Sequence, residues 1–343
     1  MSKFVVTGGE SNLDEQPGIR VVEYDGSSLS QVDSKRLNAS GDSIDSIWAA
    51  VQGDYLFAAH GPIAALSGST LTVLKLSDLS IVDTVTDTPN GRSVAPFASE
   101  DRVIFAHAPD STGHIKLYSF DGAALAELDS FDIGVSNKIL GIDASPVDSR
   151  FFHSVSNRQA LFSIPSDVIT QEDIIILDSD DFDGIRYSPS GEYVALSDGT
   201  TLRVVSVSGD TITSVANITG ANGQPSWISN NRIITARAAF DFDGSTLTKA
   251  FDLRASFGEH AVASDDGQYI LVADQDQSVY LYDSSGSLLT SLDINADIDD
   301  LEAIPGPSGP TTEEQIFQAT YANASAAPPK RTALVRPLDV QRS

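Results

Sequence analysis

The stretch that decides the fold is Phe182-Asp-Gly-Ile-Arg-Tyr-Ser-Pro-Ser-Gly-Glu-Tyr-Val-Ala-Leu-Ser-Asp-Gly-Thr-Thr-Leu-Arg-Val-Val-Ser-Val-Ser-Gly-Asp-Thr-Ile-Thr-Ser-Val215. It contains four short apolar segments, which are separated by Ser-Pro-Ser-Gly, Asp-Gly and Ser-Gly-Asp turns. Glycine adopts the positive φ that such turns need, and aspartate and serine side chains bind the turn backbone. The pattern predicts four antiparallel strands, named A to D from first to last.

The same unit recurs along the chain. A second clear copy runs from His260-Ala-Val-Ala-Ser-Asp-Asp-Gly-Gln-Tyr-Ile-Leu-Val-Ala-Asp274 through Val279-Tyr-Leu-Tyr-Asp283 to Leu288-Leu-Thr-Ser-Leu292. Candidate A strands begin near Ile44, Val94, Leu140, Gly184, Pro225, His260 and Leu301. Units spaced by roughly 35–50 residues are typical of propeller blades, which bury their faces against their neighbours. We therefore expect an all-β, seven-bladed β-propeller, with eight blades as the alternative.

Closure of the ring requires strands from both ends of the sequence. Phe4–Thr7, Ile19–Tyr24 and Leu29–Leu37 supply strands B, C and D without a preceding A strand. Leu301–Ile304 can supply that missing strand, so residues 1–306 form the propeller. Residues 307–343 are then a C-terminal extension, in which 316–320 and 333–336 are expected to form an extra hairpin.

Two turns carry a family resemblance. Ser188-Pro-Ser-Gly-Glu-Tyr-Val-Ala and Ser264-Asp-Asp-Gly-Gln-Tyr-Ile-Leu resemble the turn-and-strand signature of WD-repeat and YVTN-type propellers, although the Trp-Asp pairs of true WD repeats are absent. The three-plus-one closure resembles that of lactonase-type seven-bladed propellers. The lactonase resemblance implies His, Glu and Arg near the channel, and Arg186, Glu259 and His260 are the loose matches.

The charge balance limits the classes of partner. Lys and Arg total 21 against 48 Asp and Glu, a net charge of −27, which disfavours nucleic acid and anionic membranes. Abundant Asp and scarce Lys are typical of salt-adapted, halophilic proteins, while a plain acidic surface is the alternative reading. The sequence contains no cysteine, so disulfides and thiolate metal sites are excluded.

The expected location follows from the hydropathy. The apolar N-terminal segment breaks at Thr7-Gly8-Gly9, too early for a cleavable signal peptide. No apolar run reaches the ~18 residues of a membrane helix. We expect a soluble protein without membrane insertion, in the cytoplasm or as part of a virion.

Acidic D–A connections suggest a partner-binding rim. Asp42, Asp45, Asp297, Asp299 and Asp300 lie in two such connections, which propeller topology places on one face. Ordinary solvated loops are the alternative interpretation. Arg331 and Arg336 of the extension are basic residues in an acidic chain, and we expect them to clasp the acidic rim of a second subunit. The expected partners are thus other proteins or further copies of the chain.

Metal and imidazole sites are less clearly indicated. Asp178, Asp180, Asp181 and Asp183 are dense enough for calcium, but Ser190 stands where an EF-hand needs a bidentate Glu. Apart from this calcium hypothesis, no cofactor is expected. Arg186 is expected to pair with the same aspartate cluster.

His60 and His107 occupy matching B-strand ends, which repetition of the blade explains without a metal.

No catalytic motif is present. Gly-x-Ser-x-Gly, a phosphate-binding loop and His-Glu-x-x-His are all missing, so no catalytic residue is assigned. Trp48 and Trp227 in A strands are expected to pack between blades. The sequence favours a non-enzymatic interaction scaffold, a structural component of a larger assembly such as a virion or surface complex. The alternative is a lactonase-like hydrolase or small-ligand binder at the channel mouth.

Overall fold

The computed structural model describes residues 1–8, 18–37, 44–62, 69–87, 91–98, 101–107, 113–133, 139–155, 158–177, 184–253, 260–274, 277–294 and 298–305. These residues belong to one compact unit, Met1–Pro305. The second unit, Gly306–Ser343, lies outside the described residues. The predicted extra hairpin therefore stays a prediction.

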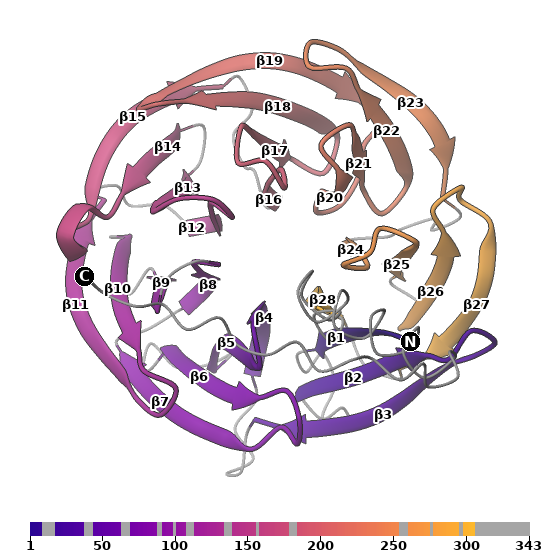
Figure 1. The fold of residues 1–343 in the computed structure, drawn as a ribbon, viewed down its shortest axis with the longest axis horizontal. Coiled ribbons are helices and arrows are strands. Elements are labelled where there is room, and N and C mark those ends of the chain that lie inside the picture. The colour runs from indigo at the N-terminus through magenta and orange to yellow at the C-terminus, as the bar shows by residue number, and fades with distance from the viewer. Residues whose placement is uncertain are drawn as a thin grey trace, which may run out of the picture. The chain divides into compact units, whose positions relative to one another are not determined.

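The described strands form seven four-stranded antiparallel sheets around a central axis (Figure 1). Blade 1 contains β28 (Asp300–Ile304), β1 (Ser2–Gly8), β2 (Gly18–Tyr24) and β3 (Leu29–Arg36), from the axis outward. Blade 2 contains β4 (Ile44–Gln52), β5 (Tyr55–Pro62), β6 (Ser69–Lys75) and β7 (Ile81–Asp87). Blade 3 contains β8 (Gly91–Pro96), β9 (Arg102–His107), β10 (His114–Phe120) and β11 (Leu125–Asp132). The prediction of an all-β, seven-bladed propeller is confirmed.

The remaining four blades repeat this order. Blade 4 contains β12 (Ile139–Ala144), β13 (Arg150–Val155), β14 (Arg158–Ser163) and β15 (Thr170–Ile176), with the short 3₁₀ turn η1 (Pro165–Asp167) before β15. Blade 5 contains β16 (Gly184–Tyr187), β17 (Tyr193–Ser197), β18 (Thr201–Ser208) and β19 (Thr211–Thr219). Blade 6 contains β20 (Ser226–Ser229), β21 (Arg232–Ile234), β22 (Ala238–Phe242) and β23 (Leu247–Asp252). Blade 7 contains β24 (His260–Ala263), β25 (Tyr269–Asp274), β26 (Ser278–Asp283) and β27 (Leu288–Asp293).

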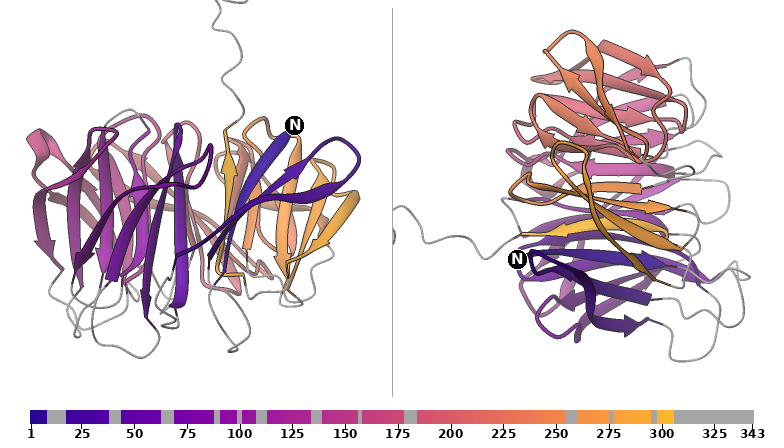
Figure 2. Two further views of the ribbon diagram at one scale, coloured as in Figure 1. Left: turned by 90° about the horizontal axis from the view of Figure 1, so that it is seen from below. Right: turned by 90° about the vertical axis from the view of Figure 1, so that its right-hand side faces the viewer.

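The ring is closed by β28, as expected from the sequence. This strand pairs antiparallel with β1 in a register that runs from Lys3↔Ile304 to Thr7↔Asp300. Figure 2 shows the yellow β28 beside the indigo N-terminal strand. The buried Leu301 packs with Phe4 and with Leu271 of blade 7, which joins the last blade to the first.

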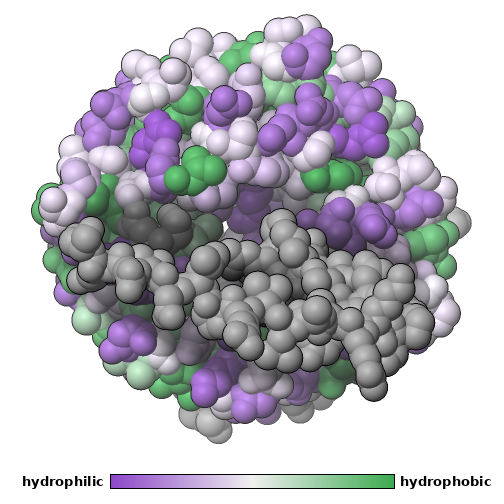
Figure 3. All heavy atoms as spheres, viewed as in Figure 1, coloured by the Kyte–Doolittle hydropathy of each residue, from purple (hydrophilic) through white to green (hydrophobic). Residues whose placement is uncertain are grey.

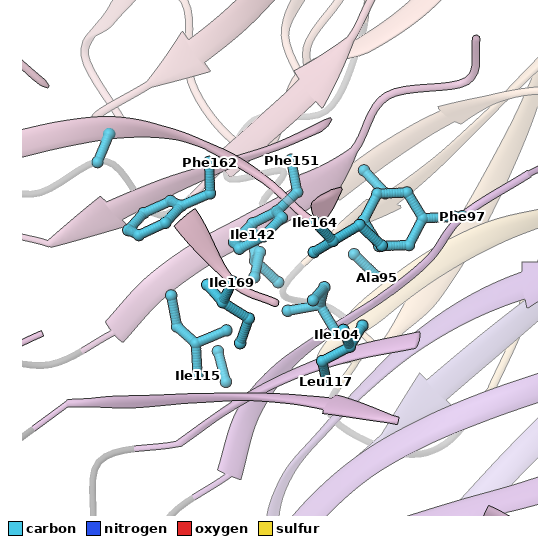
Figure 4. Packing of buried hydrophobic residues seen from close by; sticks show 13 residues of the cluster. Ala95, Phe97, Ile104, Ile115, Leu117, Ile142, Phe151, Phe162, Ile164 and Ile169 are labelled. Atoms are coloured by element: carbon cyan, nitrogen blue, oxygen red, sulfur yellow. The ribbon is translucent and has the colours of Figure 1, made fainter. Parts of the chain in front are cut away.

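Each interface between neighbouring blades has its own apolar core. Between blades 3 and 4, Phe97 and Ile104 face Phe151 and Phe162, and all four are fully buried (Figure 4). The rings of Phe151 and Phe162 stack with centroids 4.9 Å apart. The second strand of a blade is an almost continuous apolar run, as in Tyr193–Ser197 and Tyr269–Asp274, because both faces of every blade are covered by a neighbour.

Much of the aspartate content has a structural role in turns. In the C–D turn of blade 6, one carboxylate oxygen of Asp243 accepts hydrogen bonds from the backbone N–H groups of Ser245 and Thr246 at 2.9 and 2.7 Å. The corresponding Asp25 of blade 1 binds the N–H groups of Ser28 and Ser27, and these bonds lower its pKa to about 2. Part of the Asp excess therefore serves the fold, and adaptation to salt stays a prediction.

No helix within the described ranges is long and apolar enough to cross a membrane.

Candidate functional site in the central channel

An ion pair crosses the central channel. The guanidinium of Arg186 on β16 donates a hydrogen bond to the carboxylate of Glu302 on β28. These strands belong to blades 5 and 1, which are not neighbours in the ring. The innermost strands contact one another in ring order, so a side chain that joins these two blades must span the channel. Arg186 and Glu302 therefore connect opposite sides of the ring.

Other carboxylates bind the free inner edges of A strands. Asp300 accepts a hydrogen bond from the N–H of Ala49 at 3.0 Å, and Asp299 accepts one from the N–H of Ile47 at 3.0 Å. On the other side of the channel, Asp143 of β12 accepts one from the N–H of Tyr187 at 2.6 Å. An innermost strand has no further strand to pair with, so its N–H groups need such acceptors when they are buried.

The environment raises the pKa of three acids at the channel. Burial raises the pKa of Asp300 to about 6 and that of Glu302 to about 8, and the positive charge of Arg186 offsets only part of the rise. Burial also raises the pKa of Asp143, again against the attraction of Arg186. Burial alone would lower the pKa of Arg186, but the carboxylates of Glu302, Asp143 and Asp300 outweigh it and raise the value.

Histidine and tryptophan complete the surroundings of the ion pair. His260 begins β24, and its ring lies edge-to-face against Trp48 with centroids 6.1 Å apart. Burial, with a smaller effect of Arg186, lowers the pKa of His260 to about 4, so this imidazole is neutral at pH 7. The indole N–H of Trp227 donates to the backbone carbonyl of Arg186 at 3.0 Å.

The cavity beside these groups is small. Trp48, Ser93, Arg186, Gln224 and Asp300 help to line it, and its water-accessible volume is about 20 Å³. One water molecule needs roughly 10–15 Å³ on this measure, so one or two waters fill the space. Along the axis, the visible surface around the channel is mainly hydrophilic (Figure 3).

The structure locates some of the predicted site residues. Asp300 is 2% exposed and Asp299 is half-buried, and both carboxylates bind β4 as described above. Asp45 belongs to β4, where its side chain is not described. The remaining predicted partner-binding, calcium and lactonase-like residues lie outside the described ranges: Asp42, Asp297, Arg331, Arg336, Asp178, Asp180, Asp181, Asp183 and Glu259. Partner binding by the acidic rim and calcium binding thus stay predictions.

Of the two matching histidines, His60 has a described side chain, and it is buried in the blade. Nε2 of the buried His60 lies 3.0 Å from the hydroxyl of Thr72, and burial lowers its pKa to about 4. His107 ends β9, and its side chain is not described. Within the described residues, no three His, Cys, Asp or Glu side chains form a group that could hold a metal ion.

Sequence reasoning missed the centre of the channel site. Among the described residues, Arg186 pairs with Glu302, which is 116 residues away in the sequence. The aspartates at 178–183, its expected partners, lie outside the described residues, so that pairing stays a prediction. Asp143 was not considered. The usable signal was a charged residue between apolar ones in a predicted innermost strand, as in Gly141-Ile-Asp-Ala144 and Leu301-Glu-Ala-Ile304.

Of the two tryptophans, Trp227 packs between blades 5 and 6 as expected, whereas Trp48 packs partly against blade 3 and also lines the cavity.

Comparison with known proteins defines the class of fold. No protein-family model matches the chain, and no relative is found among curated proteins. Solved structures do match. A putative 6-phosphogluconolactonase from Bacteroides uniformis superposes with a TM-score of 0.71 at 14% identity, over 88% of this chain and 99% of that one. The periplasmic gluconolactonase of Pseudomonas aeruginosa gives 0.70 at 13% identity, over 90% and 100%.

Interaction propellers are also among the similar structures. Sqt1 from Chaetomium thermophilum, solved bound to the N-terminus of ribosomal protein L10, gives a TM-score of 0.57 at 15% identity, over 75% of this chain and 76% of that one. At such low identities these likenesses show the fold alone. The chain has a β-propeller fold of the kind found in both lactonase-type and WD-repeat proteins.

Proposed function

We propose that this propeller is a non-catalytic interaction platform and a structural component of a larger protein assembly, for which a virion or surface complex is one setting. The observation that carries the proposal is how the channel side chains are engaged. Arg186 and Glu302 pair with each other, and Asp143, Asp299 and Asp300 bind strand edges. The cavity beside them has room for one or two waters.

Charge distribution supports a protein partner or a second copy of the chain. Residues 306–343 contain four basic residues (Lys330, Arg331, Arg336 and Arg342) and three acidic ones, a net charge of +1. Subtraction from the chain totals leaves 17 basic and 45 acidic residues in 1–305, a net charge of −28. Opposite charges on two parts of one chain favour contacts between copies, since each tail is attracted to another copy's ring.

The rigid ring supports the same proposal. Loops that project from a stiff scaffold are common sites of binding. The solved structures with this fold include one within the mitotic checkpoint complex and one bound to a ribosomal-protein peptide. These neighbours act in protein complexes, which is the role proposed for this chain.

Deletion of residues 311–343 tests the proposal by analytical ultracentrifugation at ~0.15 M and ~2 M salt. The full chain is expected to assemble at the lower salt, and the deleted chain is expected to stay folded and monomeric. A matched full-length variant, Lys330→Glu/Arg331→Glu/Arg336→Glu, should also fail to assemble, because it reverses the charge without shortening the chain. Unchanged assembly of both variants would contradict the proposed role of the tail.

A second candidate function rests on one observation. Arg186, Glu302 and His260 all lie at the channel, and Nδ1 of His260 has no hydrogen-bond partner among the described residues. This arrangement is compatible with a lactonase-like hydrolase or a small-ligand site. Turnover of a lactone panel that is abolished in His260→Ala but retained in the control His114→Ala, at a partly exposed position of β10, would favour this candidate over the platform.

A further inference from the structure

The channel cluster contains more negative than positive groups. It consists of three carboxylates, Asp143, Asp300 and Glu302, around the single guanidinium of Arg186. The side chains of Arg186 and Glu302 are 23% and 16% exposed, so protons can reach them through the channel. One guanidinium cannot neutralise three carboxylates, and a net charge of −2 in a buried site is costly.

The charged groups on the surrounding strands offer no further compensation. His260 on β24 is neutral at pH 7, because burial lowers its pKa to about 4. Lys3 on β1 forms an ion pair with Glu23 of β2, 3.2 Å away. On β4, the uncharged Trp48 and Ala49 line the cavity beside the cluster, and Gln224 and Trp227 approach from blade 6 without charge. Among the described residues, Arg186 is the cation that acts on both Asp300 and Glu302, and uptake of a proton would reduce the negative charge that it leaves.

We propose that one exchangeable proton is held by the channel cluster, which consists of Asp143, Arg186, Asp300 and Glu302. The ring that β28 closes is therefore more stable against unfolding at neutral than at alkaline pH. Two of the three acids belong to β28, the strand that seals the ring. Asp300 attaches β28 to the inner edge of β4, and Glu302 attaches it to β16 across the channel. The proton therefore resides where the first and last parts of the chain meet.

The sign of the pH effect follows from linkage. Burial raises the pKa of Glu302 from 4.5 to about 8, so the folded ring binds more protons than the unfolded chain between these values. Stability then decreases as the pH rises through this window, and the loss is complete above the folded-state pKa. A histidine with an ordinary pKa of 6.5 contributes little above pH 7, so between pH 7 and 9 a comparison with a variant that lacks the Glu302 carboxylate measures the contribution of this group.

The test compares thermal unfolding of wild type and Glu302→Gln between pH 7 and 9, in ~2 M salt to screen the surface charge. Glutamine keeps a hydrogen-bond acceptor for Arg186 but cannot ionise. The wild-type Tm is expected to fall with pH, and the fall in Glu302→Gln is expected to be less than half as large. Asp101→Asn, at an exposed turn position, is the control that should keep the wild-type slope.

Two results would overturn the proposal: a flat wild-type profile, or an equal slope in wild type and Glu302→Gln. If Glu302→Gln does not fold, calorimetry of the wild type in two buffers of different ionisation enthalpy at pH 8 decides. Net release of protons on unfolding supports the proposal, and no release or net uptake refutes it.

Discussion

Asp129 of blade 3 and Ile169 of blade 4 are joined by a hydrogen bond of 2.7 Å, in which the carboxylate accepts from the backbone N–H. The same link recurs around the rim. Asp83 of blade 2 binds the N–H of Leu125 at 2.7 Å, and Asp173 of blade 4 binds the N–H of Ile212 at 2.8 Å. Each aspartate lies on an outermost strand next to a β-bulge, which turns its side chain toward the next blade.

These rim links should contribute measurably to stability. Asp129→Ala removes a charged acceptor from a backbone N–H, and we expect a loss of about 1–2 kcal/mol in the free energy of unfolding. Urea titration measures the effect. Ser130→Ala, at the exposed neighbouring position of the same strand, is expected to change it by less than about 0.5 kcal/mol. Equal effects of the two substitutions would show that the link is energetically irrelevant.

Two glycines have the same backbone conformation but different surroundings. Their substitution by alanine therefore distinguishes the cost of a strained backbone from the cost of a steric clash. Gly191 and Gly199 have φ of +72° and +78°. A Cβ at Gly191 would lie 2.4 Å from Cγ2 of Val147, whereas one at Gly199 would have no neighbour within 4 Å. Gly199→Ala should therefore cost about 1 kcal/mol for the left-handed backbone, and Gly191→Ala clearly more. A smaller loss for Gly191→Ala in urea titration would contradict the packing of this A–B turn.

Buried neutral histidines predict sensitivity to acid. Burial lowers the pKa of His60 and His260 to about 4 and that of His153 to about 3. Below pH 6.5 the unfolded chain binds more protons at these sites, so stability falls as the pH drops toward these folded-state values. Each histidine should remove about 2 kcal/mol between pH 6.5 and 4.5.

Substitution of one histidine tests this prediction. Nε2 of His153 is buried without a hydrogen-bond partner among the described residues. His153→Leu should therefore lose less stability than the wild type between pH 6.5 and 4.5, as followed by Tm. His114→Gln on the partly exposed β10 should keep the wild-type slope. A wild-type slope in His153→Leu would mean that this imidazole takes up its proton as readily in the folded ring as in the unfolded chain.

The sequence predicted the ring because the blade signal is local. Turn residues such as Ser188 and Gly191 act within a few positions of the strands they connect, and Ser188 Oγ accepts from the N–H of Tyr193 at 3.1 Å. The expected A strand near His260 begins at that residue, and the expected closing strand near Leu301 begins one residue earlier. Local repetition was sufficient for strand number, order and closure.

The channel site could not be predicted in the same way. The partnership of Arg186 with Glu302 depends on the radius of the ring and on side-chain length across its axis, and neither quantity is encoded in the spacing of repeats. Similarly, the sequence presents Asp300 as a loop acid, but in the structure its carboxylate binds the free edge of β4. Its position one residue before the predicted closing strand was visible in the sequence, whereas its burial depends on the assembled ring.

Closure by β28 is the structural claim on which the channel site and the proposed platform depend. The chain has no cysteine, so Lys3→Cys/Ile304→Cys offers one defined disulfide between directly paired positions of β1 and β28. Oxidation should consume both thiols and stabilise the ring by about 4 kcal/mol, because the bond closes a very long loop. The oxidised protein should then melt roughly 6 °C above its reduced form. Two free thiols after oxidation, or identical melting of both forms, would contradict closure by this strand.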